Sequence, residues 1–419
     1  MLRVAVVGGS IGGLATARVF HRLGASVRVF EKSPTSFEGR GGVRDRRSAL
    51  QRPWRSSFDL MTSTLCLIRA PQSIGYCNVD LWQEVCGKQM LRRGRQASRA
   101  QGAFLYGAPW HLRETFAPAR RSAAAHARAG DLWQFWYDEL PAGTVRFNVS
   151  VDDLGEDPLR PTIGGKVFDL AVVADGGWSA LRAKYFDDRE PQYGGYQVWR
   201  FRVPAAAVPG FRAFGDYSDG TYHQTIFLDV AMNNGEDWIM GGSSIAVPES
   251  EVTKPATGGG TNRQTGAAES SGPPPWYLPW YKQHFGAHAR GELYRCMAAA
   301  AEHGKIASMP QYEFAARRVV SGRRVLVGDA AHMASPRTAS GAHTAVLDAA
   351  GLLNAFAPLM AGGATSPGGW GAVVDAALAA YGPPALQRAA ALYARSLEVS
   401  ADVVPPGWKR GSSGRDREL

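Results

Sequence analysis

The stretch VAVVGGSIGG, residues 4–13, decides the fold of this chain. Four apolar residues run directly into a glycine-rich turn, a helical stretch follows over Leu14 to Leu23, and a second apolar run over Ser26 to Phe30 ends at Glu31. This order predicts a strand, a tight turn, a helix and a second strand. Such a turn leaves the backbone open and aims a helix N-terminus at one point, the layout that binds a dinucleotide pyrophosphate.

The details of the turn support this interpretation. Gly8 and Gly13 match the pattern G-x-G-x-x-G, while Ser10 takes the middle position with a small hydroxyl that can donate to a phosphate oxygen. Glu31 follows at the spacing where a carboxylate binds the hydroxyls of an adenosine ribose. A plain strand-to-helix turn explains the glycines alone, but the helix, the second strand and Glu31 together favour a site for FAD or NAD.

Composition bounds the class of protein. At 419 residues with 45% hydrophobic content, the chain is expected to form two domains. It has no run of eighteen apolar residues, so no membrane span is expected, and a strand that begins near residue 2 leaves no room for a signal peptide. The four cysteines show no metal-binding spacing, which fits a reduced, cytoplasmic setting.

The positive charge is local. The net charge is +10, but residues 40–128 hold sixteen Lys and Arg against five Asp and Glu, which leaves the rest of the chain near neutral. No aromatic and basic motif typical of nucleic-acid binding accompanies the excess. We therefore expect no nucleic-acid partner and interpret the charges as a solvated segment.

The pattern along the chain predicts an α/β fold of two domains. We expect a discontinuous, Rossmann-like dinucleotide-binding domain over residues 1–185 and 305–400 and an inserted mixed β-sheet substrate domain over 186–304. Within these, residues 43–125 are anomalous because they show no sustained periodicity. Residues 253–275, rich in Gly, Thr, Ser and Pro, are predicted to be a disordered insertion, and residues 401–419 a loose tail.

Three predicted strand ends carry polar loops, namely residues 8–13, 175–182 and 328–341. Ligands of open α/β sheets bind outside the carboxyl ends of the strands, so these loops are expected to share one site. Asp329 can hold a polyol further along the cofactor, although Gly328-Asp329 is also good helix-capping chemistry, and both roles are compatible. An extended dinucleotide with a ribityl chain fits better than NAD.

The chain resembles the FAD-dependent aromatic-ring hydroxylases, which are single-component flavin monooxygenases. The resemblance is greatest to the 2,6-dihydroxypyridine and 6-hydroxynicotinate hydroxylase type. Three motifs carry the resemblance: VAVVGGSIGGLATA with the following EKSP at residues 31–34, ADGGWSALR at residues 174–182 with YQVWR at 196–200, and RVLVGDAAHMASPRTASGAHTAVLDAAGLL at residues 324–353.

The resemblance implies a role for each matching residue. The pyrophosphate and adenosine ends of FAD would be held by Gly8, Ser10, Ile11, Gly12, Gly13, Glu31 and Lys32. Asp329 would bind the ribityl chain, Ser340, Gly341 and Ala342 would lie against the isoalloxazine, and Pro336 would line the substrate pocket beside it. Arg128 would contact the FAD phosphate or ribose, and Asp175 and Arg182 belong to a motif implicated in FAD and NAD(P)H binding. Surface or capping roles are the alternative for Arg128, Asp175 and Arg182.

The resemblance also implies the reaction. NADPH or NADH would reduce FAD, and a small electron-rich aromatic substrate would receive one oxygen atom from O2, in a site that excludes water. A homodimer is compatible with this class. Alternatives are a flavoprotein of the same fold that performs epoxidation or simple oxidoreduction, and a non-catalytic FAD-fold protein with a degenerate pocket. An NAD-dependent dehydrogenase is disfavoured by the motif around Asp329.

Some features stay open at the level of sequence. Residues 43–125 do not resemble the family, and a diverged insertion or a mistranslated or mis-spliced block would each explain them. Tyr222 and His223 are candidates for the catalytic base in the expected substrate sheet, although a structural role is the alternative. His332 is expected to pack beneath the Gly328-Asp329 loop. No metal site is expected, because His284 and His288 have no evident third ligand.

Overall fold

The computed structural model describes residues 1–33, 65–67, 125–127, 129–209, 216–218, 224–231, 237–252, 292–302, 306–338, 340–361, 369–401 and 403–404, together with Pro279 and Lys282. Most of the anomalous block 43–125, the insertion 253–275 and the tail beyond residue 404 lie outside these ranges, so those expectations stay predictions. Arg128, Tyr222, His223, His284 and His288 also lie outside the described residues.

The first sheet is built on the predicted strand, helix and strand unit. Its strand order is β14-β15-β8-β1-β2-β5, formed by β14 (Val320–Ser321), β15 (Arg324–Leu326), β8 (Leu170–Val173), β1 (Arg3–Val7), β2 (Ser26–Phe30) and β5 (Val145–Arg146). The five strands from β15 to β5 pair in parallel, and β14 pairs with β15 in the antiparallel sense. Continuous burial along β8 is typical of a parallel strand covered on both faces.

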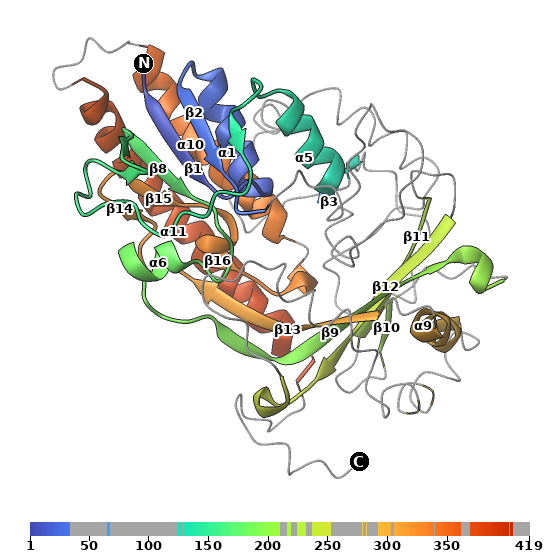
Figure 1. Cartoon of the computed structure of the whole chain (residues 1–419). Coiled ribbons are helices and arrows are strands. Elements are labelled where there is room, and N and C mark those ends of the chain that lie inside the picture. The colour runs from blue at the N-terminus through green and yellow to red at the C-terminus, as the bar shows by residue number, and fades with distance from the viewer. Residues whose placement is uncertain are drawn as a thin grey trace, which may run out of the picture.

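Helices cover this sheet (Figure 1). The helix α1 (Ile11–Arg22) packs against α5 (Ala129–Asp138) and α10 (Gly341–Ala361), and α10 packs in turn against α11 (Gly369–Ala401). Phe20 of α1 and Phe356 of α10 meet edge to face with ring centroids 4.9 Å apart. The α1 helix follows β1 directly and returns the chain to β2, which pairs with β1 in parallel, so the predicted strand, helix and strand are present.

The second sheet has the order β10-β11-β12-β9-β13-β16. It contains β10 (Asp216–Ser218), β11 (Gln224–Ala231), β12 (Asp237–Ala246), β9 (Gln192–Pro204), β13 (Ile306–Ala315) and β16 (His332–Met333). Every described pairing in it is antiparallel, so the expected mixed sheet is corrected to an antiparallel one. Only short segments separate β10, β11 and β12 in the sequence, which favours antiparallel pairing there because a parallel pair needs a long crossover. The α/β class and the Rossmann-like unit are confirmed.

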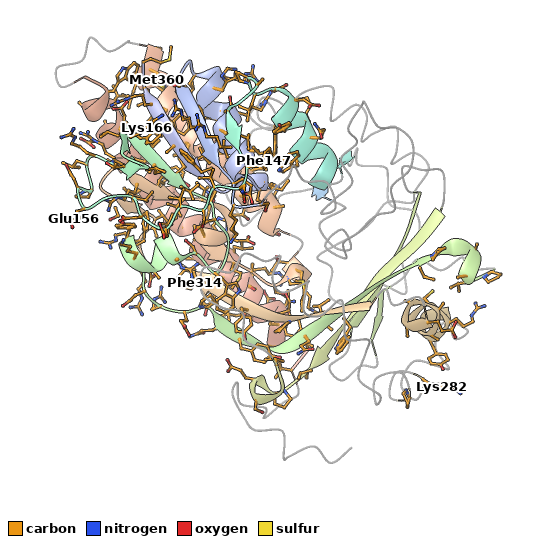
Figure 2. The ribbon with its side chains drawn as sticks, in the orientation of Figure 1. Phe147, Glu156, Lys166, Lys282, Phe314 and Met360 are labelled. Atoms are coloured by element: carbon orange, nitrogen blue, oxygen red, sulfur yellow. The ribbon has the colours of Figure 1, made fainter. Side chains whose placement is uncertain are left out.

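Two long strands of the second sheet, β9 and β13, extend toward the first sheet (Figure 1). In Figure 1, β9 and β13 run from beside the α/β unit into the lower sheet, where α9 (Glu292–Glu302) packs against them. The chain therefore stays in the second sheet until Ala315, past the expected domain limit at residue 305. The domain limits themselves stay a prediction. Figure 2 shows side chains filling the space around the first sheet, with Phe314 where β13 approaches it.

The remaining elements are short. They comprise the strand pairs β3 (Leu65–Leu67) with β4 (Ala125–Ala127) and β6 (Thr162–Ile163) with β7 (Lys166–Val167), the helix α6 (Ala180–Tyr185), and the 3-10 turns η2 (Ala205–Ala207), η3 (Glu249–Glu251), η5 (Gly328–Ala330) and η6 (Pro336–Thr338). Both η5 and η6 lie between β15 and α10, in the segment that carries the third predicted motif.

One described helix, α10, is long and apolar enough to cross a membrane by length and composition. A buried core helix passes the same test, and α10 packs against α1 and α11 with 56% of its most apolar window buried. A single such helix is weak evidence for a span.

Candidate functional site

The first loop of the site is a cradle that only glycine can form. Gly8 has φ +104°, and a Cβ there would lie 2.2 Å from the Ala174 carbonyl oxygen. A Cβ on Gly13 would lie 1.9 Å from the Gly8 carbonyl oxygen. Both clashes are with backbone, which cannot turn away, so the sequence Gly8 to Gly13 lets α1 approach the strand ends closely.

The N-terminus of α1 is available to a ligand. Ser10 is its N-cap residue, and the exposed Ser10 side chain makes no capping hydrogen bond. The first intrahelical hydrogen bond is donated by Leu14 to the Ser10 carbonyl, so the amides of Ile11, Gly12 and Gly13 have no acceptor within the helix. No acidic side chain occupies the first turn. This end of α1 therefore presents N–H groups and a favourable dipole to an anion.

Glu31 lies beside this loop at the end of β2. Its carboxylate is 8% exposed. One oxygen accepts a hydrogen bond from the Gly9 amide at 2.7 Å, and the other accepts from the Ser33 amide and hydroxyl at 2.9 Å and 2.6 Å. Trp133 of α5 holds the other side of the loop, because its Nε1–H donates to the Gly9 carbonyl at 2.6 Å. The acid is thus held rigidly at the predicted ribose position.

The second loop, after β8, presents Asp175. Its Oδ1 atom is buried and has no hydrogen-bond partner among the described residues. Burial raises the pKa of Asp175 to about 6, although Ser179, Arg182 and Lys32 favour its charged form. A buried carboxylate oxygen without a donor is rare in a folded protein and points to a missing hydroxyl or amide donor.

The third loop, after β15, presents Asp329 from η5. Its side chain is exposed to solvent, while desolvation by the surrounding protein atoms raises its pKa. Gly328 precedes it with φ +61°. A Cβ built on Gly12 would lie 3.7 Å from the Gly328 Cα, so the first and third loops are in contact.

A buried carboxylate supports the third loop from below. Asp348 of α10 accepts hydrogen bonds from the Gly328 amide at 2.9 Å, from His332 Nε2 at 2.7 Å and from Arg388 Nη2 at 3.0 Å. Burial opposes ionisation, but His332, Arg388 and the Gly328 amide lower the pKa of Asp348. Asp348 correspondingly raises the pKa of His332 against the effect of burial. His332 packs beneath the loop, as the sequence predicts.

Arg182 connects the second and third loops. Its buried guanidinium donates from Nη1 to the carbonyl oxygens of Gly177 at 2.7 Å and Ala330 at 3.4 Å. The guanidinium carbon lies 4.1 Å from the Phe314 ring centroid. Burial lowers the pKa of Arg182 to about 10, so it stays charged at neutral pH. Its side chain therefore braces two loops from within, and any effect on a cofactor is indirect.

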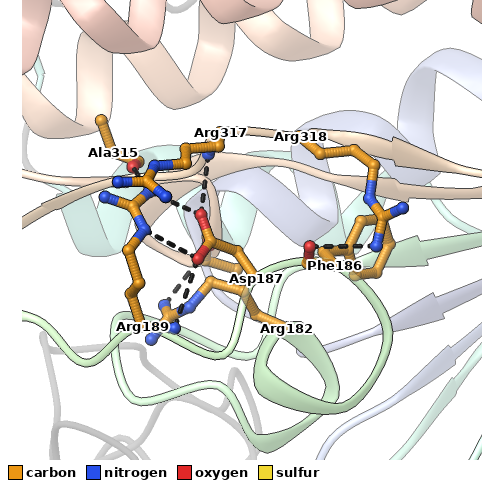
Figure 3. A network of polar contacts seen from close by, with 8 residues as sticks. Arg182, Phe186, Asp187, Arg189, Ala315, Arg317 and Arg318 are labelled. Carbon is orange, nitrogen blue, oxygen red and sulfur yellow. Dashed lines mark hydrogen bonds and ion pairs between the residues drawn. The ribbon is translucent and has the colours of Figure 1, made fainter.

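A second ionic cluster anchors the chain after α6 to the end of β13 (Figure 3). Arg189 donates to both carboxylate oxygens of Asp187, at 2.9 Å and 2.6 Å, and to the Ala315 carbonyl at 2.9 Å. The Arg317 amide also donates to Asp187, at 2.8 Å. Burial opposes the ionisation of Asp187, but these hydrogen bonds lower its pKa to about 2. The segment behind the second loop is thereby fixed to the second sheet.

The remaining predicted residues lie between η5 and α10. Pro336 begins η6, and Gly341 and Ala342 begin α10; all three are partly buried. A Cβ on Gly341 would lie 4.0 Å from Asp329 Oδ1, so the start of α10 borders the third loop. Burial lowers the pKa of His343, in the same turn, to about 4, so its imidazole is neutral at pH 7.

The structure thus brings together the predicted residues of all three loops. The cofactor roles assigned to individual residues stay predictions. Sequence reasoning did not identify Trp133, Asp348 and Arg388, which hold the loops in place. Their only signals are a polar or indole group within otherwise apolar helices, and these signals do not reveal the partner. Among the described residues, no group of three His, Cys, Asp or Glu side chains is placed to hold a metal ion.

Comparisons with known proteins agree with this geometry. Residues 288–392 match the family described as FAD binding domain. The chain is 26% identical to 3-amino-4-hydroxybenzoate 2-monooxygenase of Streptomyces cremeus over 83% of this chain and 76% of that protein. It is 26% identical to the chloroplastic zeaxanthin epoxidase of Spinacia oleracea over 47% of this chain and 28% of the epoxidase.

Its fold is similar to that of the 2,6-dihydroxypyridine-3-hydroxylase of Arthrobacter nicotinovorans. The TM-score is 0.60 with 17% sequence identity, over 98% of this chain and 95% of the hydroxylase.

The fold, the three loops and these similarities define an FAD-dependent monooxygenase. Within that class, the chain is similar to the FAD-dependent aromatic-ring hydroxylases, as its motifs predict. FAD is accordingly the cofactor.

Proposed function

We propose that the protein hydroxylates a small aromatic or N-heteroaromatic ring that already carries an electron-donating hydroxyl group, with NADPH or NADH as electron donor. The observation that carries the proposal is the convergence of three polar loops at the carboxyl edge of the parallel strands. One of these loops contains η5, which connects β15 of this sheet to β16 of the antiparallel sheet. The overall reaction is NAD(P)H + H+ + O2 + substrate giving NAD(P)+ + H2O + hydroxylated substrate.

The loops fit FAD on their own chemistry. The cradle of Gly8 and Gly13 excludes any side chain, and the α1 amides with Ser10 suit a pyrophosphate. The Glu31 carboxylate, held by the Gly9 amide, would accept hydrogen bonds from the hydroxyls of a ribose, and Lys32 follows it as an exposed cation. These features support placing the adenosine diphosphate end of FAD along the first loop.

The other two loops fit the rest of the cofactor. Asp175 offers a buried oxygen that has no donor among the described residues, and Asp329 offers an exposed carboxylate. The Asp329 carboxylate suits the hydroxyls of the ribityl chain, and the Asp175 oxygen suits a hydroxyl or amide donor of the cofactor. Gly341 and Ala342, at the start of α10, would then border the isoalloxazine, and Pro336 the substrate.

FAD, when bound, supplies the exchange of a hydride with NAD(P)H and the activation of O2. The protein must orient the cofactor and the ring and keep water from the reacting groups. In this account Asp348 and Arg182 hold the second and third loops rigid from beneath. The antiparallel sheet reaches these loops through Phe314 of β13, which the Arg182 guanidinium contacts.

Deprotonation of a ring hydroxyl would increase its electron density and is a task for a general base. We propose Tyr222 and His223 as candidates because they directly precede β11 in the sequence. Arg128, next to β4, is retained as a candidate for FAD contact.

Epoxidation is the second candidate function, because the chain matches a plant epoxidase over nearly half of its own length. That match covers a minor part of the epoxidase, whereas the match to an aminohydroxybenzoate monooxygenase covers most of both proteins. The products separate the two, since an epoxide forms from an isolated double bond and a phenol from an aromatic ring.

We further propose a cytoplasmic location, supported by the absence of a cysteine framework in the sequence, and a homodimeric state. Cell fractionation tests the first, and light scattering on the purified protein tests the second. A secreted protein or a strictly monomeric one would contradict them.

The function is tested with purified protein and added FAD. After desalting, phenols, aminophenols, hydroxybenzoates and hydroxypyridines are screened with NADH and NADPH for O2 uptake and product mass. The product is expected to gain one oxygen atom for roughly each NAD(P)H consumed, and under 18O2 that atom is expected to be 18O. Ring-independent NAD(P)H oxidation without oxygenated product would support simple oxidoreduction instead.

A further inference from the structure

A ring of buried polar side chains lies at the junction of the two sheets, behind the turn η6. We call it the hydroxyl ring, and it consists of Tyr196, Glu313, Ser335, Ser396 and Ser400. Their exposed fractions are 0% or 1%. They come from β9, β13, the residue before η6, and two successive turns of α11, so four separate parts of the chain meet there.

The hydrogen bonds of the ring close on themselves. Tyr196 and Ser335 share a hydrogen bond of 2.5 Å between their hydroxyl oxygens. The Ser335 amide donates to Ser396 Oγ at 2.6 Å, and Ser396 donates to Glu313 Oε1 at 2.9 Å. Ser400 donates to the same carboxylate oxygen and lies 3.5 Å from the Tyr196 hydroxyl.

The sequence sets up this geometry through local features. Ser396 and Ser400 are separated by four residues, which puts both hydroxyls on one face of α11. In β13, the pairing with β9 shifts register between Pro310 and Tyr312. An irregularity of this kind re-aims the side chains that follow it, and Glu313 follows it directly.

Ser335 connects the hydroxyl ring by hydrogen bonds to η6 and to the first turn of α10. Its hydroxyl accepts a hydrogen bond from the Arg337 amide at 3.2 Å, and its carbonyl accepts from the Thr338 amide and hydroxyl at 3.0 Å and 2.8 Å. Thr338 accepts from the Ser340 amide at 3.2 Å, and the Ser340 carbonyl accepts from Thr344 in the first turn of α10. A continuous series of hydrogen bonds therefore links the ring to the start of α10.

We propose that the hydroxyl ring sets the position of η6 and of the α10 N-terminus relative to the antiparallel sheet, and that Tyr196 is the positioning residue at its centre. This inference rests on the function proposed above, in which Pro336 borders the substrate and Gly341 borders the flavin. The ring then fixes the gap in which the aromatic substrate lies against the cofactor.

The consequence is a control of coupling. When the aromatic substrate is correctly placed, NAD(P)H, H+, O2 and the substrate give NAD(P)+, H2O and the hydroxylated product. When the gap widens, the same NAD(P)H, H+ and O2 give NAD(P)+ and H2O2, and the substrate leaves unchanged. Tyr196 touches neither reactant directly in this account, so its removal should change the partition between the two outcomes more than FAD affinity.

The test compares Tyr196→Phe with Tyr193→Phe. Tyr193 lies on the same strand, is equally buried at 4% exposure, and donates one hydrogen bond to the Val247 carbonyl at 2.8 Å. Each substitution removes one buried hydroxyl, but only the first removes it from the hydroxyl ring. Ser400→Ala supplies a smaller change at the opposite side of the ring.

Two measurements on each full-length variant decide the proposal. Amide hydrogen exchange at Ser340 and Thr344 is expected to be about tenfold faster in Tyr196→Phe than in Tyr193→Phe, as a lost buried hydrogen bond predicts. The ratio of hydroxylated product to NAD(P)H consumed is expected to fall at least threefold in Tyr196→Phe and Ser400→Ala, with a matching rise in H2O2 and an FAD Kd within twofold of the wild type.

Unchanged exchange at both amides in Tyr196→Phe overturns the proposal, whether or not the protein turns over a substrate. Faster exchange with unchanged coupling overturns the link to the reaction. A wild-type protein that binds FAD but never hydroxylates a ring contradicts the proposed function instead, and the exchange measurement still decides the positioning role.

Discussion

The substitution Gly13→Ala tests the cradle at the heart of the site. The new Cβ would lie 1.9 Å from the Gly8 carbonyl oxygen, whereas such contacts essentially never fall below 3.0 Å. The loop and the first turn of α1 must therefore separate by about 1 Å. Overpacking of this kind costs about 1–3 kcal/mol, which corresponds to roughly 5- to 150-fold in an equilibrium constant.

The cost is expected to appear as weaker FAD binding, because the displaced α1 amides no longer converge on the pyrophosphate. Titration of the apoprotein with FAD, followed by flavin fluorescence, measures the Kd. Thermal unfolding of the same apoprotein shows whether the clash also destabilises the protein without FAD, as a lower unfolding temperature.

Gly177→Ala is the matched control. Its Cβ would meet Met333 Sδ at 2.1 Å, a clash as short as that of Gly13 but with a flexible side chain that can turn away. Its FAD Kd is expected to stay within about threefold of the wild type. A Gly13→Ala variant with wild-type FAD affinity and wild-type unfolding temperature would refute the reasoning about the cradle.

Three further predictions concern the residues around the loops. Burial raises the pKa of Asp175 to about 6, above its ordinary value of 3.8, so its contribution to stability is fully present below about pH 4 and is lost as the pH rises through about 6. Asp175→Asn apoprotein should therefore melt above the wild type at pH 7.5 and equal to it near pH 4, and equal melting at both pH values would contradict the desolvation of this carboxyl. Asp348→Asn should weaken FAD binding by about tenfold or more, because two charge-assisted hydrogen bonds under the third loop lose their acceptor charge; unchanged affinity by fluorescence titration would show that the loop holds its shape without them. Arg182→Met should keep the stem packed on Phe314 but free the Gly177 and Ala330 carbonyls, which lowers the unfolding temperature by several degrees in calorimetry; a wild-type unfolding temperature would argue against a bracing role.

The first strand, helix and strand could be predicted because their signals are local. The apolar run of β1, the glycine turn and the acid after β2 lie within one short stretch, and each obeys its own short-range rule. The second and third loops follow from the same logic, since Asp175 and Asp329 each come directly after a buried strand.

The supports of the site could not be predicted in the same way. Glu313 meets a serine 87 residues away, and Tyr196 meets one 139 residues away. Asp348 occurs within an apolar helix, where it looks like an isolated polar residue until His332 and Arg388 are placed against it. Such pairings depend on tertiary packing, which short-range sequence patterns do not encode. The antiparallel nature of the second sheet likewise depends on how its strands pair.

The most direct test of the account is the visible spectrum of the purified protein after FAD is added and the excess removed by desalting. The account predicts flavin bands that stay with the protein, that are bleached by NADPH or NADH without oxygen, and that return with oxygenated aromatic product when O2 and a suitable ring are supplied. Protein that retains no flavin at micromolar concentration would contradict the claim that its three loops form an FAD site.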